Sequence, residues 1–93
     1  MNSMSVQQYR QLPDIGPRDI GALPAHVADK ISAGETAVKA VREWRGLSQI
    51  DLADRSGVAI TQIQRAEIGH DASIAMLRCL ARALRVRDDI LIR

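Results

Sequence analysis

The stretch that decides the fold lies at residues 46–69 and reads GLSQIDLADRSGVAITQIQRAEIG. Ser48 is suited to cap a helix over about residues 49–56, because its hydroxyl can accept a hydrogen bond from a free backbone N–H. Gly57 comes where the chain must turn sharply, and glycine takes the left-handed backbone conformation without a Cβ penalty. A second helix over about residues 60–67 follows. The stretch therefore predicts two short helices joined at a glycine.

The apolar residues of this stretch fit that pairing. Val58 and Ile63 can tuck the second helix against Leu52 and Ala53 of the first, which leaves the other face of the second helix polar. Two short helices on a shared core, one of them exposed, have the geometry of a helix-turn-helix, whose exposed helix enters the major groove of DNA. The stretch thus indicates a unit that reads DNA.

Apolar spacing before this stretch predicts two more helices. Three apolar residues recur at intervals of four: Leu23, Val27 and Ile31. This spacing favours a helix over about residues 24–32, with Pro24 at its first position. Thr36 can cap the next helix, which would end at Gly46.

Apolar spacing after the stretch completes the bundle. Ser73 can cap a helix over about residues 74–84, in which five apolar residues share one face: Ile74, Leu77, Leu80, Ala81 and Leu84. Residues 88–91 can form a last turn that covers the open end of the core. Nothing from residue 23 onward alternates with a period of two for long, so we expect an all-α fold.

The first 22 residues have a different character. All three prolines of the chain lie before residue 25, and neither helical nor strand periodicity is sustained there. We predict an irregular arm over residues 1–22, in which Ser5–Leu12 is a weak candidate for a short strand.

Composition excludes several classes of function. The 93 residues make one domain, and the formal charge of +2 permits a nucleic-acid partner without demanding one. One cysteine rules out a disulfide scaffold and a cysteine-based zinc site, and an aromatic fraction of 2% argues against stacking on single strands. No signal peptide or membrane-length apolar run is visible, so we expect a cytoplasmic protein. No nucleophile–base pair or metal-ligand cluster stands out, and we expect neither an enzyme nor a cofactor.

Residues 36–92 resemble the Xre-type, or lambda-repressor-like, helix-turn-helix domain. The matching positions, in order, are Arg42, Gly46-Leu47-Ser48-Gln49, Leu52-Ala53, Gly57-Val58, Ile63, Arg65, Glu67, Gly69, Leu77, Leu80-Ala81 and Ala83-Leu84. The chain departs from the family pattern at four positions: Ala59, Gln64, Ala66 and Arg85. The resemblance implies a compact five-helix bundle with an extra N-terminal helix and the irregular arm.

The resemblance also implies which residues face DNA bases. In that family, the residues that open the exposed helix face base edges, and here they are Ile60, Thr61 and Gln62. Ile60 and Thr61 can touch a thymine methyl group, and Gln62 can read adenine. One turn further along lie Gln64 and Arg65, and Arg65 could fork onto guanine or hold a phosphate. The alternative is an ordinary polar helix face.

Other family positions imply phosphate contacts and structural support. Gln49 would bind a phosphate at the positive end of the helix dipole, beside Ser48, unless Ser48 only caps the helix and Gln49 is solvated. His70 could also reach a phosphate. Arg42 and Glu67 would form a partly buried ion pair that holds the exposed helix in place.

Two further residues leave alternatives open. Trp44 lies off the apolar stripe of its helix, so it packs on the N-terminal helix or marks a partner surface. Cys79 also lies off its stripe, and we expect it to be half exposed or at a subunit contact, and inert.

A single exposed helix of this size reads only a few base pairs. Discrimination among DNA sequences usually requires two half-sites, so we expect a homodimer on near-palindromic double-stranded DNA. The fifth predicted helix, with Arg78, Arg82 and Arg85 on its outer side, and the arm are candidate dimer contacts; the arginine row is alternatively a solvated face.

A second resemblance concerns residues 23–38, which look like the segment before this domain in helix-turn-helix antitoxins of type II toxin–antitoxin modules. It implies an arm at residues 1–22, a linking helix at residues 23–35 that could contact a toxin or a second subunit, and a DNA-binding domain at residues 36–93. An antitoxin would neutralise a toxin protein and repress its own operon. The alternatives are a free-standing Xre-family regulator of phage or plasmid type and an interaction module that binds no DNA.

Overall fold

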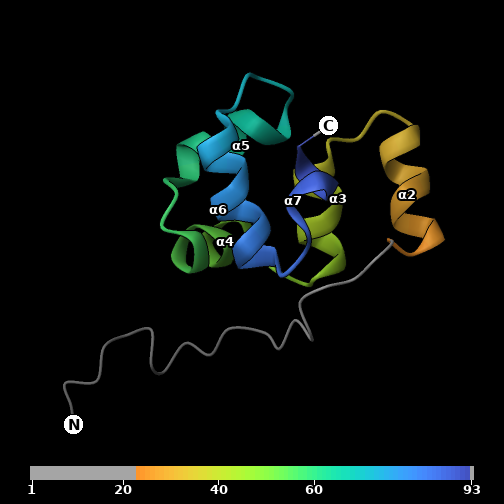
Figure 1. The fold of residues 1–93 in the computed structure, drawn as a ribbon, viewed down its shortest axis with the longest axis horizontal. Helices are drawn as coiled ribbons and strands as arrows, with labels where there is room; N and C mark the ends of the chain where they lie inside the picture. Colours follow the sequence, from red (N-terminus) through yellow and green to blue (C-terminus); the bar gives the residue numbers. More distant parts are fainter. Residues whose placement is uncertain (1–22, 93) are drawn as a thin grey trace, which may run out of the picture.

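The computed structural model describes residues 23–92, which form six helices (Figure 1). Their bounds are α2 (Ala25–Ser32), α3 (Ala37–Trp44), α4 (Gln49–Ser56), α5 (Ile60–Glu67), α6 (Ile74–Leu84) and α7 (Asp88–Leu91). No strand occurs in this range, and the predicted all-α bundle with an extra N-terminal helix is confirmed. The expected arm over residues 1–22, with its candidate strand at Ser5–Leu12, lies outside the described residues.

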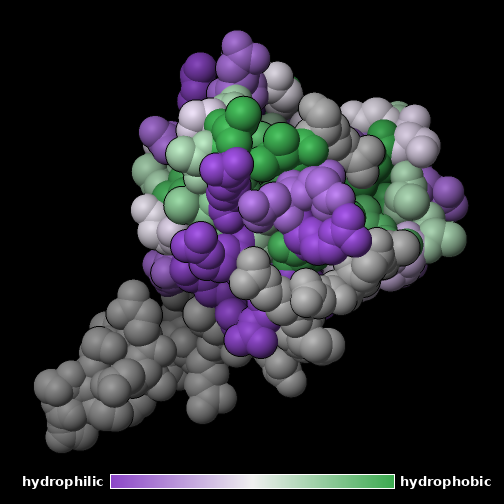
Figure 2. All heavy atoms as spheres, in the orientation of Figure 1, coloured by the Kyte–Doolittle hydropathy of each residue, from purple (hydrophilic) through white to green (hydrophobic). Residues whose placement is uncertain are grey.

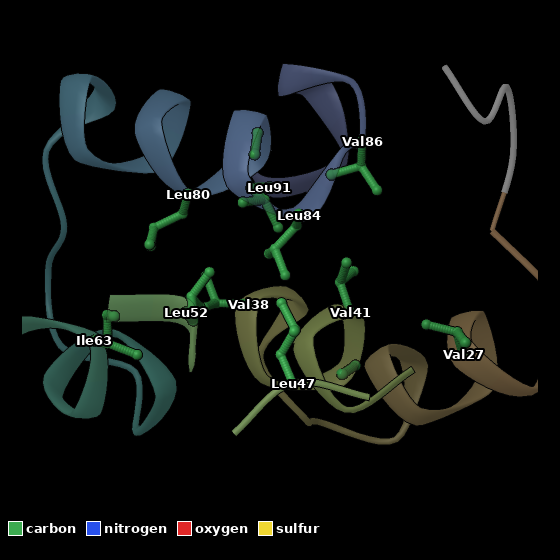
Figure 3. Close-up of a cluster of buried hydrophobic side chains, with 12 residues drawn as sticks. Val27, Val38, Val41, Leu47, Leu52, Ile63, Leu80, Leu84, Val86 and Leu91 are labelled. Carbon is green, nitrogen blue, oxygen red and sulfur yellow. The ribbon is translucent and has the colours of Figure 1, made fainter. Parts of the chain in front are cut away.

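The core forms where α6 crosses the other helices. Helix α6 packs against α3, α4 and α7, and α4 also packs against α5. Figure 3 shows Leu80 and Leu84 pointing from α6 toward Leu52 of α4 and Val38 of α3, and both leucines are fully buried. Truncating such a leucine to alanine typically costs about 2–5 kcal/mol, so this contact fixes where α4 and α5 stand on the bundle.

Helix α2 packs on α3 at one end of the bundle through Val27, which is buried. We expected Pro24 at the first helical position, but it precedes the helix as its N-cap residue, with an extended backbone (φ −55°, ψ 150°). Its carbonyl accepts hydrogen bonds from the N–H groups of Val27 and Ala28, both at 3.0 Å. The helix therefore begins one residue later than predicted.

Helix α4 is capped at both ends, and its second cap forms the turn into α5. The Ser48 hydroxyl accepts from the Asp51 N–H, and the Asp51 carboxylate accepts from the Ser48 N–H, each at 3.0 Å. This reciprocal capping box satisfies two otherwise free donors. At the other end, Gly57 has φ +75°, the left-handed conformation that the sequence predicts there. Ala59 precedes α5 as its N-cap residue and makes no side-chain capping bond, because its methyl group cannot accept one.

The cap expected from Thr36 is wrong. Thr36 precedes α3, but its side chain makes no capping bond to that helix. Its hydroxyl instead donates to the backbone carbonyl of Glu67 at 3.0 Å. Carbonyls in the last turn of a helix have no partner within the helix, so this bond satisfies one of them and ties the start of α3 to the end of α5.

The end of α6 is held by a side chain from α3. Arg85 follows α6 in the left-handed conformation (φ 57°, ψ 47°), which glycine adopts more readily than arginine. The buried Arg45 guanidinium donates to the Leu84 carbonyl at 3.0 Å and to the Arg85 carbonyl at 2.9 Å. Burial, together with the nearby charge of Arg85, lowers the pKa of Arg45 below its usual value.

Trp44 lies half-buried against the core, with the Arg45 guanidinium 4.2 Å from its ring centroid. Cys79 is exposed on α6. The longest helix among residues 23–92 has 11 residues. No helix in this range has the length and the apolar character that crossing a membrane requires.

Candidate nucleic-acid interface

Helix α5 has one buried face and one solvent face. Ile63, Ala66 and Glu67 are buried, whereas four polar side chains are exposed: Thr61, Gln62, Gln64 and Arg65. Ile60 is half-buried at the start of the helix. The exposed residues are those that the sequence assigns to base contacts, so the structure leaves them accessible and places them on one short helix.

Arg42 and Glu67 lie together beneath this helix. The Arg42 Nε is 2.6 Å from Glu67 Oε2 and its Nη2 is 3.0 Å from Oε1, so the pair is bidentate. Both residues are buried, with exposed fractions of 9% and 7%. The remaining Arg42 Nη1 donates to the Leu47 carbonyl at 2.8 Å. Because the charges are matched and hydrogen-bonded, they fix the end of α5 against α3 and the loop before α4.

The same carboxylate also orients a glutamine at the start of α4. Gln49 Nε2 donates to Glu67 Oε1 at 3.0 Å, and Gln49 Oε1 accepts from Gln64 Nε2 at 3.4 Å. The negative charge of Glu67 therefore sets which end of the Gln49 amide faces it, and Gln49 in turn sets which end of Gln64 faces α4. Sequence reasoning assigned Gln49 only to a phosphate or to solvent and missed this chain of hydrogen bonds.

The surface continues from α5 into the start of α6. Gln62 and Arg65 line a hollow of about 230 Å³ together with Asp71, Ala72, Ser73 and Met76. His70 follows α5, and its side chain is exposed. Ile68, which sequence reasoning left unassigned, is 73% exposed beside it. Ser48, the N-cap residue of α4, is exposed as well.

Comparison with known proteins fits this geometry. Residues 38–91 match the family described as helix-turn-helix. The chain belongs to the helix-turn-helix family. No curated protein and no solved structure matched the chain.

Membership of the helix-turn-helix family implies a DNA partner and a role in regulating transcription. The matched range runs from Val38 in α3 to Leu91 at the end of α7. It contains the whole α4–α5 pair and leaves α2 outside. Helix α2 is therefore an addition to the helix-turn-helix domain, although the predicted division at residues 22 and 35 stays a prediction.

Proposed function

We propose that this chain is a sequence-specific transcriptional repressor that inserts α5 into the major groove of double-stranded DNA. The observation that carries the proposal is that α5 has one buried face and one solvent-exposed face. Its polar residues Thr61, Gln62, Gln64 and Arg65 point to solvent, while its other face is locked to the bundle. A helix presented in this way matches the recognition helix of a helix-turn-helix.

In this proposal, α5 reads base edges. Ile60 and Thr61 approach thymine methyl groups, and Gln62 and Gln64 each offer an amide that can pair with adenine. The bond from Gln64 to Gln49 leaves Gln64 one N–H and its carbonyl oxygen, which are the two groups that adenine N7 and N6 require. Arg65, at the end of the exposed row, suits guanine or a phosphate.

The phosphate contacts come from the ends of the neighbouring segments. Ser48 and Gln49 lie at the N-terminus of α4, where the helix dipole favours an anion. The Gln49 amide uses one N–H on Glu67 and keeps a second N–H for a phosphate oxygen. His70 lies just beyond the C-terminal end of α5, where its N–H donates to the Arg65 carbonyl. These contacts set the position of the protein on DNA, whereas α5 sets the sequence preference.

We infer that the repressor acts as a homodimer on a near-palindromic operator. One helix of eight residues contacts only a few base pairs. Two copies spaced by about one turn of DNA, roughly 34 Å, double the read sequence and supply discrimination that a single copy lacks. The symmetry of the preferred DNA site and the stoichiometry of the complex test this inference.

DNA titration tests the reading role directly. Binding of the full chain to the DNA upstream of its own gene is compared with binding to a scrambled duplex, at several salt concentrations. The complex loses affinity steeply with salt. As a base contact, Arg65 contributes about 1–3 kcal/mol, so Arg65→Ala reduces the preference for the true site by about 5- to 150-fold; as a phosphate contact, it lowers the affinity for both duplexes equally. Equal affinity of the wild-type chain for both duplexes contradicts the proposal.

Arg78→Ala is the matched control for this titration. Arg78 lies on α6, is exposed, and does not line the hollow beside α5. Its side chain contacts no base in this proposal, so the control variant keeps the preference of the wild-type chain; because Arg78 is also a candidate dimer contact, the oligomeric state of the variant is measured alongside. An equal loss in both variants would mean that net charge, and not a contact from α5, accounts for the Arg65 effect.

We further propose that the repressor is the antitoxin of a toxin–antitoxin module and regulates its own operon. The support is the resemblance of residues 23–38 to the corresponding antitoxin segment and the presence of α2 outside the matched domain. Helix α2 exposes most of its surface, since only Val27 of its eight residues is buried. That leaves a helical face available for a toxin. The alternative is a free-standing Xre-family regulator of phage or plasmid type.

Co-expression with the product of the neighbouring gene separates these two roles. An antitoxin co-purifies with a small toxin and rescues growth of cells that express it. The complex is lost when residues 1–33 are deleted, while DNA binding by α5 is retained. Failure of the full chain to bind or to rescue against the neighbouring protein favours the free-standing regulator.

A further inference from the structure

A second charged surface lies between the C-terminal ends of α4 and α6, away from the residues assigned to DNA. It surrounds a hollow of about 320 Å³. The lining residues are Arg55, Ser56, Cys79, Arg82, Ala83 and Arg85. Figure 2 shows hydrophilic residues gathered over this region of the visible face. We call this set of residues the arginine hollow.

The side chains that line the arginine hollow include cations but no anion. Three of the six side chains are guanidinium groups, one is a hydroxyl and one is a thiol, and no carboxylate is among them. Arg55 and Arg82 belong to the last turns of their helices, and Arg85 follows α6. Arginine in a last turn interacts favourably with the helix dipole, which explains each cation singly. It does not explain why three of them share one concave site.

The backbone of Arg85 provides a second, independent observation. Its left-handed conformation is strained for a residue with a Cβ, and glycine avoids that strain. Backbone strain of this kind is typical of ligand sites. Arg85 also lies close to the buried Arg45, whose Nη2 donates to the Arg85 carbonyl at 2.9 Å, and burial together with the charge of Arg85 lowers the pKa of Arg45.

We propose that the arginine hollow binds a phosphate group, with Arg55, Arg82 and Arg85 as its ligands. Guanidinium groups match phosphate oxygens in geometry and charge, and the Ser56 hydroxyl can add a hydrogen bond. Three guanidinium groups along one hollow favour a polyanion over a single carboxylate. The volume of the hollow is at the lower end of the range for small-molecule sites, which fits a pyrophosphate-sized group.

The phosphate can come from a free compound or from the backbone of nucleic acid. None of the residues assigned to the α5 interface lines the arginine hollow. Helix α4, at about 1.5 Å per residue, separates its N-terminal phosphate contacts from Arg55 by nearly its whole length. Binding in the arginine hollow therefore leaves α5 exposed, and the site does not depend on the proposed DNA function.

Cys79 makes the arginine hollow directly measurable, because it lines the hollow and is the only cysteine of the chain. The experiment follows alkylation of Cys79 by iodoacetamide, a neutral reagent, in the full-length protein at constant ionic strength. Inorganic pyrophosphate is the probe and chloride the reference. Pyrophosphate is expected to slow alkylation in a saturable manner, and each variant is compared with its own rate without pyrophosphate.

Arg82→Gln tests the site and Arg78→Gln is its control. Both residues are exposed on α6 one turn apart, but only Arg82 lines the arginine hollow. Losing one charge-assisted hydrogen bond raises the half-protecting concentration by about tenfold or more in Arg82→Gln. Arg78→Gln keeps the wild-type value. Absent protection in the wild-type chain, or an equal change in both variants, overturns the proposal.

DNA titration of the same two variants then identifies the source of the phosphate. If nucleic acid supplies it, Arg82→Gln lowers the salt dependence of duplex binding by about one phosphate contact. If a free compound supplies it, the salt dependence is unchanged while protection by pyrophosphate is weakened. Neither result depends on sequence-specific binding through α5, so failure of the proposed repressor function is distinguished from failure of this site.

Discussion

Arg42 and Arg45 leave the C-terminal end of α3 only three residues apart, and each is 9% exposed, yet they hold the bundle in different ways. Arg42 reaches α5 and is bound by the Glu67 carboxylate. Arg45 reaches α6 and donates to the backbone carbonyls of Leu84 and Arg85. Two arginines of the same kind thus do different things: Arg42 joins α3 to α5 through a matched ion pair, and Arg45 joins α3 to α6 through the carbonyls at a helix end.

The difference teaches where charge is used for support and where it is left for binding. Between α3 and α5, the Glu67 carboxylate offsets Arg42 and also orients Gln49, so the network supports the proposed reading surface. Between α3 and α6, Arg45 lies near the charge of Arg85, and Arg85 lines the arginine hollow together with Arg55 and Arg82. Substitutions at these positions separate the two uses.

The largest effect is expected for Arg42→Ala. It leaves the Glu67 carboxylate buried without its cation, which costs about 3–5 kcal/mol. A domain of this size has a total stability of about 5–14 kcal/mol, so the variant loses a large share of it. Urea denaturation followed by circular dichroism measures the change in the free energy of unfolding.

Arg78→Ala is the control for that measurement. Its ion pair with Asp88 is exposed, at 3.8 Å, and contributes about 1 kcal/mol or less. Adding Glu67→Ala to Arg42→Ala recovers part of the lost stability, since the stranded charge is removed. Equal effects of Arg42→Ala and Arg78→Ala would show that the buried ion pair does not hold α5.

Arg45→Met is expected to have an intermediate effect. Methionine replaces most of the buried volume, but the Leu84 and Arg85 carbonyls lose a charged donor, which costs about 1.5–3 kcal/mol. The loss is smaller than for Arg42→Ala because no full charge is stranded. Urea denaturation of the two variants side by side checks the order, and a larger loss for Arg45→Met would reverse the comparison.

Local sequence patterns predicted the helices because their determinants are local. Ser48 and Ser73 accept bonds from residues three positions further on, and Gly57 needs only its own left-handed backbone. The predicted helix of residues 49–56 accordingly has the observed bounds. The pairing of Arg42 with Glu67 came from family resemblance, since the two residues lie 25 positions apart.

Hydrogen bonds between residues far apart in the chain could not be predicted from the sequence. Thr36 looks like an ordinary cap, and only the packing of α3 against α5 reveals that the Glu67 carbonyl, 31 positions away, is its acceptor. Gln49 likewise has its partner on another helix. The left-handed backbone of Arg85 was not predicted either, because the sequence marked this residue only as a departure from the family pattern.

The smallest effect is expected for Arg85→Gly, and its sign is opposite. Glycine removes roughly 1–2 kcal/mol of left-handed strain but adds about 0.5–1 kcal/mol of chain entropy to the unfolded state, so the variant gains about 0.5–1 kcal/mol. Gly57→Ala is the inverse control. A Cβ at Gly57 meets no atom within 4 Å. Gly57→Ala is therefore expected to lose stability by about the same amount, through backbone conformation alone.

Thermal and urea denaturation of Arg85→Gly, together with its protection of Cys79 by pyrophosphate, make this variant informative in two ways. A more stable protein with weaker protection means that the strained arginine is kept for the ligand and not for the fold. A less stable protein means instead that contacts of the Arg85 side chain outweigh the backbone strain, and the strain then gives no support to a binding role. The stability and protection measurements together thus decide whether the left-handed backbone at the end of α6 argues for the arginine hollow.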